Sequence, residues 1–319
     1  MEKLTIIGSG TMGHSITLSA AWAGINVNMY GLTETDSAAG INAIRKKLEG
    51  LVAHDLIHLN EVKGILKNIR LTNSIDDAIK EASYIIECVP EDVVLKNNLF
   101  NQIDLKCGPD VILASNTSGL RLSAIVSGTR HPERTLITHF WNPAHLVPLV
   151  EVLRSPATTE EVFVRTMALL KLMGKKPIEV KKEVPGLVGN RLQFALFREA
   201  QYLLDQGIAS VEDIDAAVTF GIGRRLAVTG PLMSADMGGL DIFYTVSNNL
   251  FKNISNASES YPALQGLVSK EKYGDKSGEG YYQWDERFSA KMNMLREDYL
   301  IHLVKDDKST DNCTAGLEK

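Results

Sequence analysis

Short apolar runs alternate with longer segments of helical spacing from the start of the chain to Val180. Several runs are apolar throughout instead of alternating with polar residues, which predicts a sheet that is covered on both faces. Strands separated by helical segments of this kind pair in parallel through crossover helices. The pattern therefore predicts a doubly wound α/β sheet. The runs expected to form its strands are LTIIG, VNMY, IRLTN, YIIECV, VILASN, TLITHF, VPLVEVL and KPIEV.

The pattern changes at KKEVPGLVGNRL, where Pro185 and Gly186 interrupt the chain and β-branched runs give way to helical spacing. Further on, SVEDIDAAV begins with Ser210 three residues before Asp213, which is typical of a helix N-terminus. We therefore predict a sheet domain over residues 1–185 and an all-α substrate and dimerisation domain over residues 186–304. Residues 305–319 are polar and lack periodicity, which predicts a flexible tail.

The composition narrows the class of partner. The chain has 319 residues, 44% of them hydrophobic, which is enough for two cores. Its net charge of −5 without a long like-charge block favours a small-molecule substrate over nucleic acid or an anionic membrane. No leader pattern or membrane-spanning run is present, and three scattered cysteines suggest neither a disulfide framework nor a zinc site. We expect a cytoplasmic protein.

A glycine-rich turn, IIGSGTMG, follows the first predicted strand and precedes a helical pattern. Its GxGxxG spacing comes from Gly8, Gly10 and Gly13. The first glycine permits a tight turn, the second lets the backbone approach a pyrophosphate, and the third allows close packing of helix and strand. Backbone N–H groups of Thr11 and Met12 would bind the phosphates at the helix N-terminus. The turn predicts a Rossmann-type dinucleotide site.

The choice between NAD and NADP depends on the end of the second predicted strand. An acidic residue usually accepts the ribose hydroxyls there, but Gly31 occupies the position. No arginine follows that would hold a 2′-phosphate, and Glu34 and Asp36 would repel one, although nearby hydroxyl side chains could donate hydrogen bonds to it. We expect NAD as the cofactor, with NADP left open because of Gly31.

The segment HFWNPAHLVPLVEV is apolar enough for burial, yet it carries His139 at one end and Glu151 near the other. These residues end one predicted strand and lie on the next, so adjacent strands would bring them together. A neutral imidazole accepts an alcohol proton, and a carboxylate on its other nitrogen orients the ring and stabilises the imidazolium. The alternative is a buried pair with a packing role only.

Four motifs of the chain are SNTSGL, HFWNP, LVEV and PGLVGNRL. Together they resemble the L-3-hydroxyacyl-CoA dehydrogenase family, in a superfamily that includes carnitine and gulonate dehydrogenases. The resemblance runs from the first strand to KSGEGYYQW at 276–284. It implies that His139 is the catalytic base and Glu151 its partner. It also implies that Ser118 and Asn190 bind the reacting oxygen of the substrate and that Asn142 lines the same pocket.

The same resemblance places Glu91 and Lys96 at the nicotinamide side of the cofactor. From pattern alone, both would be solvated charges at the start of a helix. Asn116 follows a predicted strand at the edge where ligands gather in parallel sheets, and we assign it to the cofactor site. His145 lies near His139, but no third residue has metal-ligand spacing, so we predict no metal and expect a surface or supporting role for His145.

The expected reaction is hydride transfer between NAD and the 3-hydroxyl carbon of an L-3-hydroxyacyl-CoA, with short acyl chains preferred. We expect the enzyme to be a homodimer. A free 3-hydroxy acid is the alternative substrate, because VAHDLIHL lacks the lysines that would suit CoA phosphates. Trp141 would narrow the pocket or simply pack. Two other classes rank lower: a hydrolase with a triad of Ser118, His139 and Glu151, and a nucleotide-binding protein without catalysis.

Overall fold

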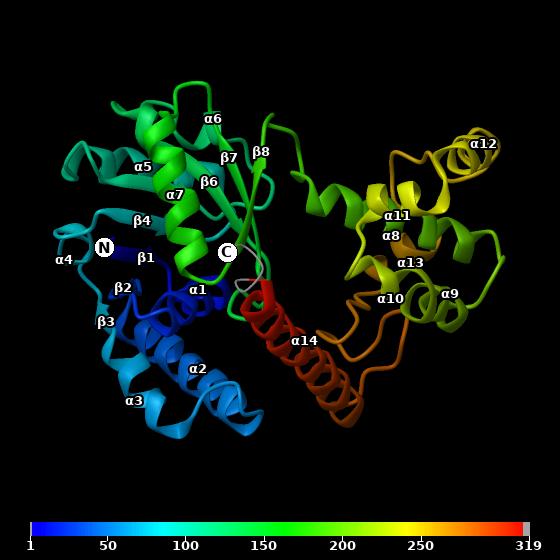
Figure 1. Cartoon of the computed structure of the whole chain (residues 1–319), viewed down its shortest axis with the longest axis horizontal. Helices are drawn as coiled ribbons and strands as arrows, with labels where there is room; N and C mark the ends of the chain where they lie inside the picture. Colours follow the sequence, from blue (N-terminus) through cyan, green and yellow to red (C-terminus); the bar gives the residue numbers. More distant parts are fainter. Residues whose placement is uncertain (1, 315–319) are drawn as a thin grey trace. The chain divides into compact units, whose positions relative to one another are not determined.

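The computed structural model describes the backbone of residues 2–314 and the side chains of residues 2–307 (Figure 1). Within that range the chain forms two compact units. One contains the residues up to Val188 together with those from Leu295 onward, and the other is Gly189–Met294. Each unit is described by itself below.

All eight runs that were predicted to be strands form one sheet, in the order β3-β2-β1-β4-β5-β6-β7-β8. Every neighbouring pair is parallel except β6 and β7, which are antiparallel. The predicted doubly wound sheet is therefore confirmed. The strands are β1 Leu4–Ile7, β2 Val27–Tyr30, β3 Ile69–Thr72, β4 Tyr84–Glu87, β5 Ile112–Ser115, β6 Thr135–Phe140, β7 Leu149–Arg154 and β8 Lys176–Val180.

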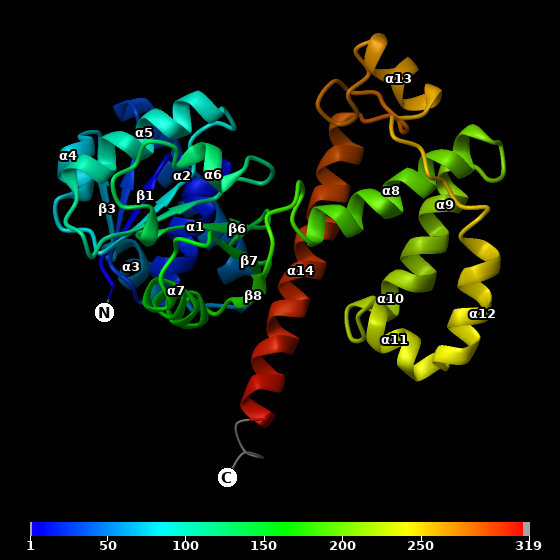
Figure 2. The same ribbon diagram turned by 90° about the horizontal axis from the view of Figure 1, so that it is seen from above.

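Both faces of this sheet are covered by helices, as the uninterrupted apolar strands predicted. Adjacent residues of a strand point to opposite faces, so Ile6 and Ile7 enter different core clusters, as do Ile86 and Ile85. One cluster includes residues of α1, α2, α3 and α7, and the other includes α4, α5 and α6; α5 and α7 lie on opposite sides of the strands in Figure 2. The helices are α1 Thr11–Trp22, α2 Glu34–Ala53, α3 Leu59–Lys67, α4 Ile75–Ile79, α5 Val93–Lys106, α6 Leu122–Ile125 and α7 Glu160–Leu172, with a 3₁₀ turn at Pro132–Arg134.

The strand order reverses between β1 and β4, because the chain crosses from β1 to β2 on one side and later returns to β4 on the other. Ligands of open α/β sheets bind outside the carboxyl ends of the strands at such a switch point. The glycine turn follows β1 there, and the polar segments after β4 and β5 lie at the same edge. The topology thus places the predicted cofactor residues together.

The second unit is helical, as predicted for the residues after the domain boundary. Its loops contain only isolated bridges among Gly274, Glu279 and Gln283 within the described residues. Ser210 caps α9 by accepting a hydrogen bond from the N–H of Asp213, which confirms the predicted helix start. The elements are α8 Gly189–Asp205, α9 Val211–Ala217, a π-helical turn Val218–Ile222, α10 Gly223–Leu226, α11 Pro231–Gly238, α12 Leu240–Leu250, α13 Pro262–Ser269 and the start of α14 Glu286–Thr314.

The structure departs from the predicted boundaries in two places. The division falls after Val188 instead of residue 185, and the chain from Leu295 joins the sheet unit instead of the helical unit. There Ile301 is buried against the core of the sheet unit, with Leu300 and Val304 packed beside it. The predicted tail is helical as far as Thr314, because α14 continues past its buried turns, and residues 315–319 lie outside the described residues. Among the described helices, none is long and apolar enough to cross a membrane.

Candidate active site

His139 and Glu151 face each other across the β6–β7 ladder. They are direct register partners in the antiparallel pair, and Nδ1 of the imidazole lies 2.8 Å from Oε2 of the carboxylate. Both side chains are buried, because β6 is buried along its whole length and β7 in its middle. The predicted adjacency of the two residues at one end of the sheet is confirmed.

The carboxylate of Glu151 is held by groups from three segments. Oε2 also accepts a hydrogen bond from the indole N–H of Trp141 at 3.2 Å, and Oε1 accepts one from the backbone N–H of Val188 at 2.8 Å. An ionised carboxylate only accepts hydrogen bonds, so the proton of the neutral imidazole of His139 resides on Nδ1. Its Nε2 then carries the lone pair, which is the form that a general base requires.

Trp141 contributes to the site in a way that neither sequence interpretation anticipated. Its ring centroid lies 5.7 Å from that of His139, with the planes tilted by 52°. Together with the hydrogen bond to Glu151, this contact makes Trp141 a support for the His–Glu pair. The presence of an indole N–H beside a buried acid was the available signal, because a buried Trp usually finds an acceptor.

The segment after β5 is tied to the end of β6. Oδ1 of Asn116 accepts a hydrogen bond from the N–H of Phe140 at 2.9 Å, directly beside His139. The next turn is organised by Glu91, whose Oε1 accepts hydrogen bonds from Thr117 Oγ1 at 2.5 Å and from the N–H of Ser118 at 3.0 Å. Ser118 itself is exposed, so its hydroxyl is accessible to a ligand.

Lys96 lies in a buried ion network. Its Nζ is 2.6 Å from Glu87 Oε1 and 3.3 Å from Glu91 Oε2, and it donates to the carbonyl of Val89 at 3.2 Å. The other oxygen of Glu87 accepts a hydrogen bond from Ser115 at 2.6 Å. Reading Lys96 as a solvated charge would therefore be wrong. Sequence reasoning missed Glu87, although an acid that ends the apolar strand YIIE was a visible signal.

Opposing effects set the protonation of the two acids in this network. Burial raises the pKa of Glu87, and the charge of Lys96 only partly offsets it. Burial also acts to raise the pKa of Glu91, but the hydrogen bond from Thr117 and the charge of Lys96 outweigh it and lower that pKa. Glu91 is therefore the ionised acceptor that holds the Thr117–Gly119 turn.

The glycine turn has the shape that a pyrophosphate requires. Gly8 has φ of +112°, and a Cβ on Gly13 would lie 1.8 Å from the carbonyl oxygen of Gly8. A Cβ on Gly10 would meet no atom within 4 Å. Of the three glycines, Gly10 is therefore the one with open space beside its backbone. Helix α1 begins at Thr11 without a side-chain cap, which leaves its first N–H groups, including that of Met12, for a ligand. The turn fits a dinucleotide.

Gly31 has a structural explanation. A Cβ there would lie 2.4 Å from Ser37 Oγ, so glycine lets the start of α2 close onto the end of β2. Asp36 is engaged in a capping box, in which its Oδ2 accepts hydrogen bonds from the N–H and the hydroxyl of Thr33 at 3.0 and 2.7 Å. Glu34 is the acidic residue that lies closest in the sequence to the expected ribose-binding position. It is exposed on the first turn of α2.

The remaining predicted residues divide between the two units. Asn142 is exposed and precedes Pro143 through a cis peptide bond, in the loop between β6 and β7. Asn190 is the second residue of α8 in the helical unit, and its place in the site stays a prediction. His145 was expected at the surface or in a supporting position, and the surface position is wrong, because the residue is buried and its Nδ1 contacts Ser15 Oγ at 3.0 Å.

Two alanine substitutions separate the packing role of the glycine turn from its binding role. We expect Gly13→Ala to lower the free energy of unfolding by about 3 kcal/mol, because its Cβ overlaps the backbone at Gly8. We expect Gly10→Ala to change that free energy by less than about 1 kcal/mol, yet to raise the Kd for NADH at least about tenfold. Urea denaturation and fluorescence titration with NADH measure the two effects. Unchanged NADH binding in Gly10→Ala would contradict the cofactor assignment.

Family models cover most of the chain. The NAD-binding domain of 3-hydroxyacyl-CoA dehydrogenase matches residues 3–184, and the C-terminal domain of 3-hydroxyacyl-CoA dehydrogenase matches residues 186–284. The two matches meet at the point where the helical pattern begins.

Individual relatives agree with the family models. An enzyme of Mesorhizobium japonicum, 5-formyl-3-hydroxy-2-methylpyridine 4-carboxylate 5-dehydrogenase, is 35% identical over 88% of this chain and 90% of its own. A probable 3-hydroxybutyryl-CoA dehydrogenase of Bacillus subtilis is 33% identical over 91% and 99%. A solved structure of the first kind of enzyme, described as an NAD⁺-dependent dismutase, has a TM-score of 0.86 and 32% identity over 96% and 98%. The chain therefore belongs to the 3-hydroxyacyl-CoA dehydrogenase family of NAD-dependent oxidoreductases.

Proposed function

We propose that the protein interconverts a short-chain L-3-hydroxyacyl-CoA and the 3-ketoacyl-CoA, with NAD as the hydride carrier. The observation that carries this proposal is the buried pair of His139 and Glu151, joined at 2.8 Å across β6 and β7. The pair supplies a base whose tautomer is set by an acceptor-only partner. Family membership supports the class of reaction.

In the direction of oxidation, Nε2 of His139 takes the proton of the 3-hydroxyl group. The turn of Gly8, Gly10 and Gly13 would hold NAD, which would supply the acceptor for the hydride from the same carbon. The imidazolium that forms is stabilised by the carboxylate of Glu151, which Trp141 and the backbone of Val188 hold in place. In the reverse direction, His139 returns its proton to the oxygen.

The polar residues predicted for the substrate would orient it. Ser118 and Asn190 would donate hydrogen bonds to the reacting oxygen, and Asn142 would line the same pocket. Glu91 supports Ser118 by accepting hydrogen bonds from its backbone N–H and from that of Gly119 at 3.0 and 3.2 Å. A rigid turn of this kind holds a substrate-binding hydroxyl in one position, which favours a productive geometry.

A free 3-hydroxy acid is the second candidate substrate, and one observation favours it. Binding of CoA phosphates would require basic residues in the segment that contains His54. His54 contacts an acid of α14 instead, with its Nε2 3.1 Å from Asp298. Burial lowers the pKa of Lys47, and the nearby charge of Glu297 offsets this only in part. The relative from M. japonicum also acts, by its name, on a pyridine carboxylate without CoA.

Matched assays distinguish the two substrates. We expect kcat/KM for acetoacetyl-CoA to exceed that for free acetoacetate at least about 100-fold at the same NADH concentration, because binding of the carrier contributes to transition-state stabilisation. The opposite preference would establish the free acid. Absence of turnover on both, together with stoichiometric NADH binding, would favour a nucleotide-binding protein without catalysis.

We also propose that the helical unit forms a homodimer. It carries apolar side chains that are more than two-thirds exposed, and a second copy would cover them. We expect a dimer in sedimentation velocity at micromolar concentration and a monomer for Leu232→Asp. Leu59→Asp is the control, because this residue of α3 is 76% exposed on the sheet unit. A monomeric wild-type protein would contradict the proposal. The exposed residues are Phe220, Val228, Leu232, Met237, Tyr244 and Phe251.

A further inference from the structure

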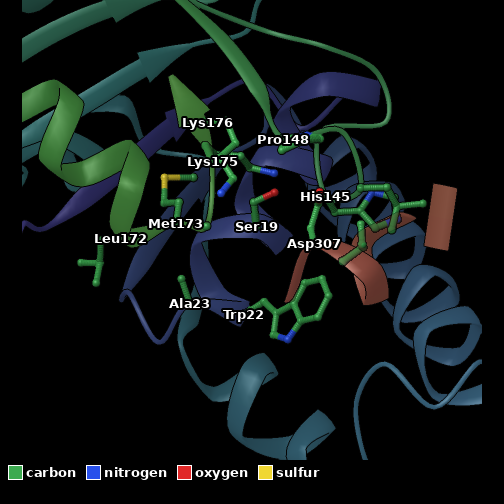
Figure 3. Close-up of a pocket in the computed structure, with 13 residues that line it drawn as sticks. Ser19, Trp22, Ala23, His145, Pro148, Leu172, Met173, Lys175, Lys176 and Asp307 are labelled. Atoms are coloured by element: carbon green, nitrogen blue, oxygen red, sulfur yellow. The ribbon is translucent and has the colours of Figure 1, made fainter. Parts of the chain in front are cut away.

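A cavity of about 270 Å³ lies within the sheet unit, next to the loop that joins β6 to β7 (Figure 3). Its walls come from the last turns of α1, the 144–148 loop, the turn between α7 and β8, and α14. Pockets for drug-sized ligands measure roughly 300–1,000 Å³, so this cavity suits a smaller molecule. None of the residues proposed above for catalysis lines it.

Lys175 places a buried ammonium group in the wall of the cavity. Only 6% of the residue is exposed, and Nζ donates hydrogen bonds to the carbonyls of Ala144 and, at 3.4 Å, of Val147. Among the described residues no carboxylate forms an ion pair with it, and burial lowers its pKa to about 8. A buried charge without a counterion is costly, and a bound anion would remove that cost.

His145 lines the same wall, but its ring nitrogens are enclosed by the protein. Ser15 Oγ accepts a hydrogen bond from the backbone N–H of His145 at 3.2 Å and lies 3.0 Å from its Nδ1. Nε2 of the ring is buried and has no hydrogen-bond partner among the described residues. Burial, with the nearby charges of Lys47 and Lys175, lowers the pKa of His145 to about 3, so the ring stays neutral.

The rest of the cavity is mainly apolar. Ser19 donates to the carbonyl of Ala144 at 3.0 Å, and Figure 3 shows its side chain beside that of Lys175. Trp22 lies on one side of these polar groups and Met173 on another.

Lys176 and Asp307 also line the cavity, but both are exposed, so Lys175 is its buried charge. One buried cation matches the single charge of a carboxylate, whereas a phosphate carries more charge than Lys175 offsets. The apolar walls match an alkyl chain.

We propose that this cavity is a second ligand site, which binds a small carboxylate with an apolar body through Lys175. The carboxylate supplies a counterion to a buried ammonium group that has none among the described residues. Its alkyl chain packs against Trp22, Leu146 and Met173.

Trp22 provides a local reporter for the test. The chain has three tryptophans, so Trp141→Phe combined with Trp284→Phe leaves only the one in the cavity wall. We expect titration of this protein with butanoate to change the Trp22 emission with saturation. Butanamide, the uncharged analogue, should bind at least about tenfold more weakly, because it lacks the charge-assisted hydrogen bond. Inorganic phosphate should also bind more weakly than butanoate.

Variants assign the binding to the buried ammonium. In the Trp22-only protein, Lys175→Met should weaken butanoate binding at least about tenfold. Lys176→Met, on the exposed rim of the same cavity, should change it less than about threefold, because an exposed charge contributes little. Equal binding of butanoate and butanamide, a larger effect of Lys176→Met than of Lys175→Met, tighter binding of phosphate, or no saturable signal would each overturn the proposal. The comparison of butanoate with butanamide needs no substitution at Lys175, so it holds even if that variant fails to fold.

Discussion

Replacing His139 with asparagine is expected to lower kcat/KM by about 10²–10⁴-fold, because the base that accepts the hydroxyl proton is lost. The side-chain amide of asparagine can still donate a hydrogen bond to Glu151, so the buried carboxylate retains a partner. Binding of NADH should stay within a factor of about two, since the glycine turn is unchanged. Steady-state kinetics in both directions and NADH titration measure the two quantities.

A matched control exists on the surface of the same unit. His131 also contacts a glutamate through Nδ1, at 3.2 Å from Glu133 Oε1, but both side chains are more than 40% exposed. His131→Asn should therefore leave kcat/KM unchanged. If His139→Asn kept more than about a tenth of the wild-type kcat/KM, the general-base role would be lost, because positioned bases contribute at least about 10²-fold.

Replacing Glu151 with glutamine is expected to reduce kcat by about 10³-fold through the tautomer of His139. With its amide NH₂ in the place of Oε2, glutamine donates to Nδ1 and its oxygen still accepts from the backbone N–H of Val188, but the indole N–H of Trp141 no longer has Oε2 as its acceptor. The ring proton then moves to Nε2, where the base needs a lone pair. Glu151 does not itself accept the substrate proton, so it acts as a positioning residue.

A purely structural role of Glu151 would give a different pattern. The tautomer argument predicts that kcat falls while KM and the Kd for NADH stay within a factor of about three, because substrate contacts are unchanged. Urea denaturation of the same variant should show a folded protein, since glutamine is nearly isosteric. A loss of activity that tracks a loss of folded protein would refute the positioning role. Glu133→Gln is the matched surface control.

Much of the fold followed from local pattern. The eight strands, the glycine turn after β1 and the cap at Ser210 all lie where periodicity and turn residues predicted them. The adjacency of His139 and Glu151 was also predictable, because the two residues sit on consecutive strands with a short connection. Such features depend on residues that are close in sequence or on a period that repeats within one element.

Other parts of the site depended on contacts between distant segments. At the switch point, the carboxylate of Glu87 accepts a hydrogen bond from Ser115 and forms an ion pair with Lys96. Neither contact can be predicted from the sequence of the separate segments. The chain from Leu295 was predicted to belong to the helical domain, but it joins the sheet unit, because Ile301 is buried there. Composition alone could not reveal that position.

Strands that are apolar throughout were enough to predict a sheet covered on both faces, and the glycine turn after the first strand was enough to predict the edge for a dinucleotide, because both signals lie within one short segment. Only the tertiary structure determined which side chains contact one another. His145 meets Ser15, and Trp141 turns its indole N–H to Glu151, because strand register and helix packing bring together atoms that lie up to 130 residues apart in the chain. Hydrogen bonds of this kind are short and directional, so they exist only when the whole backbone places both partners within about 3 Å.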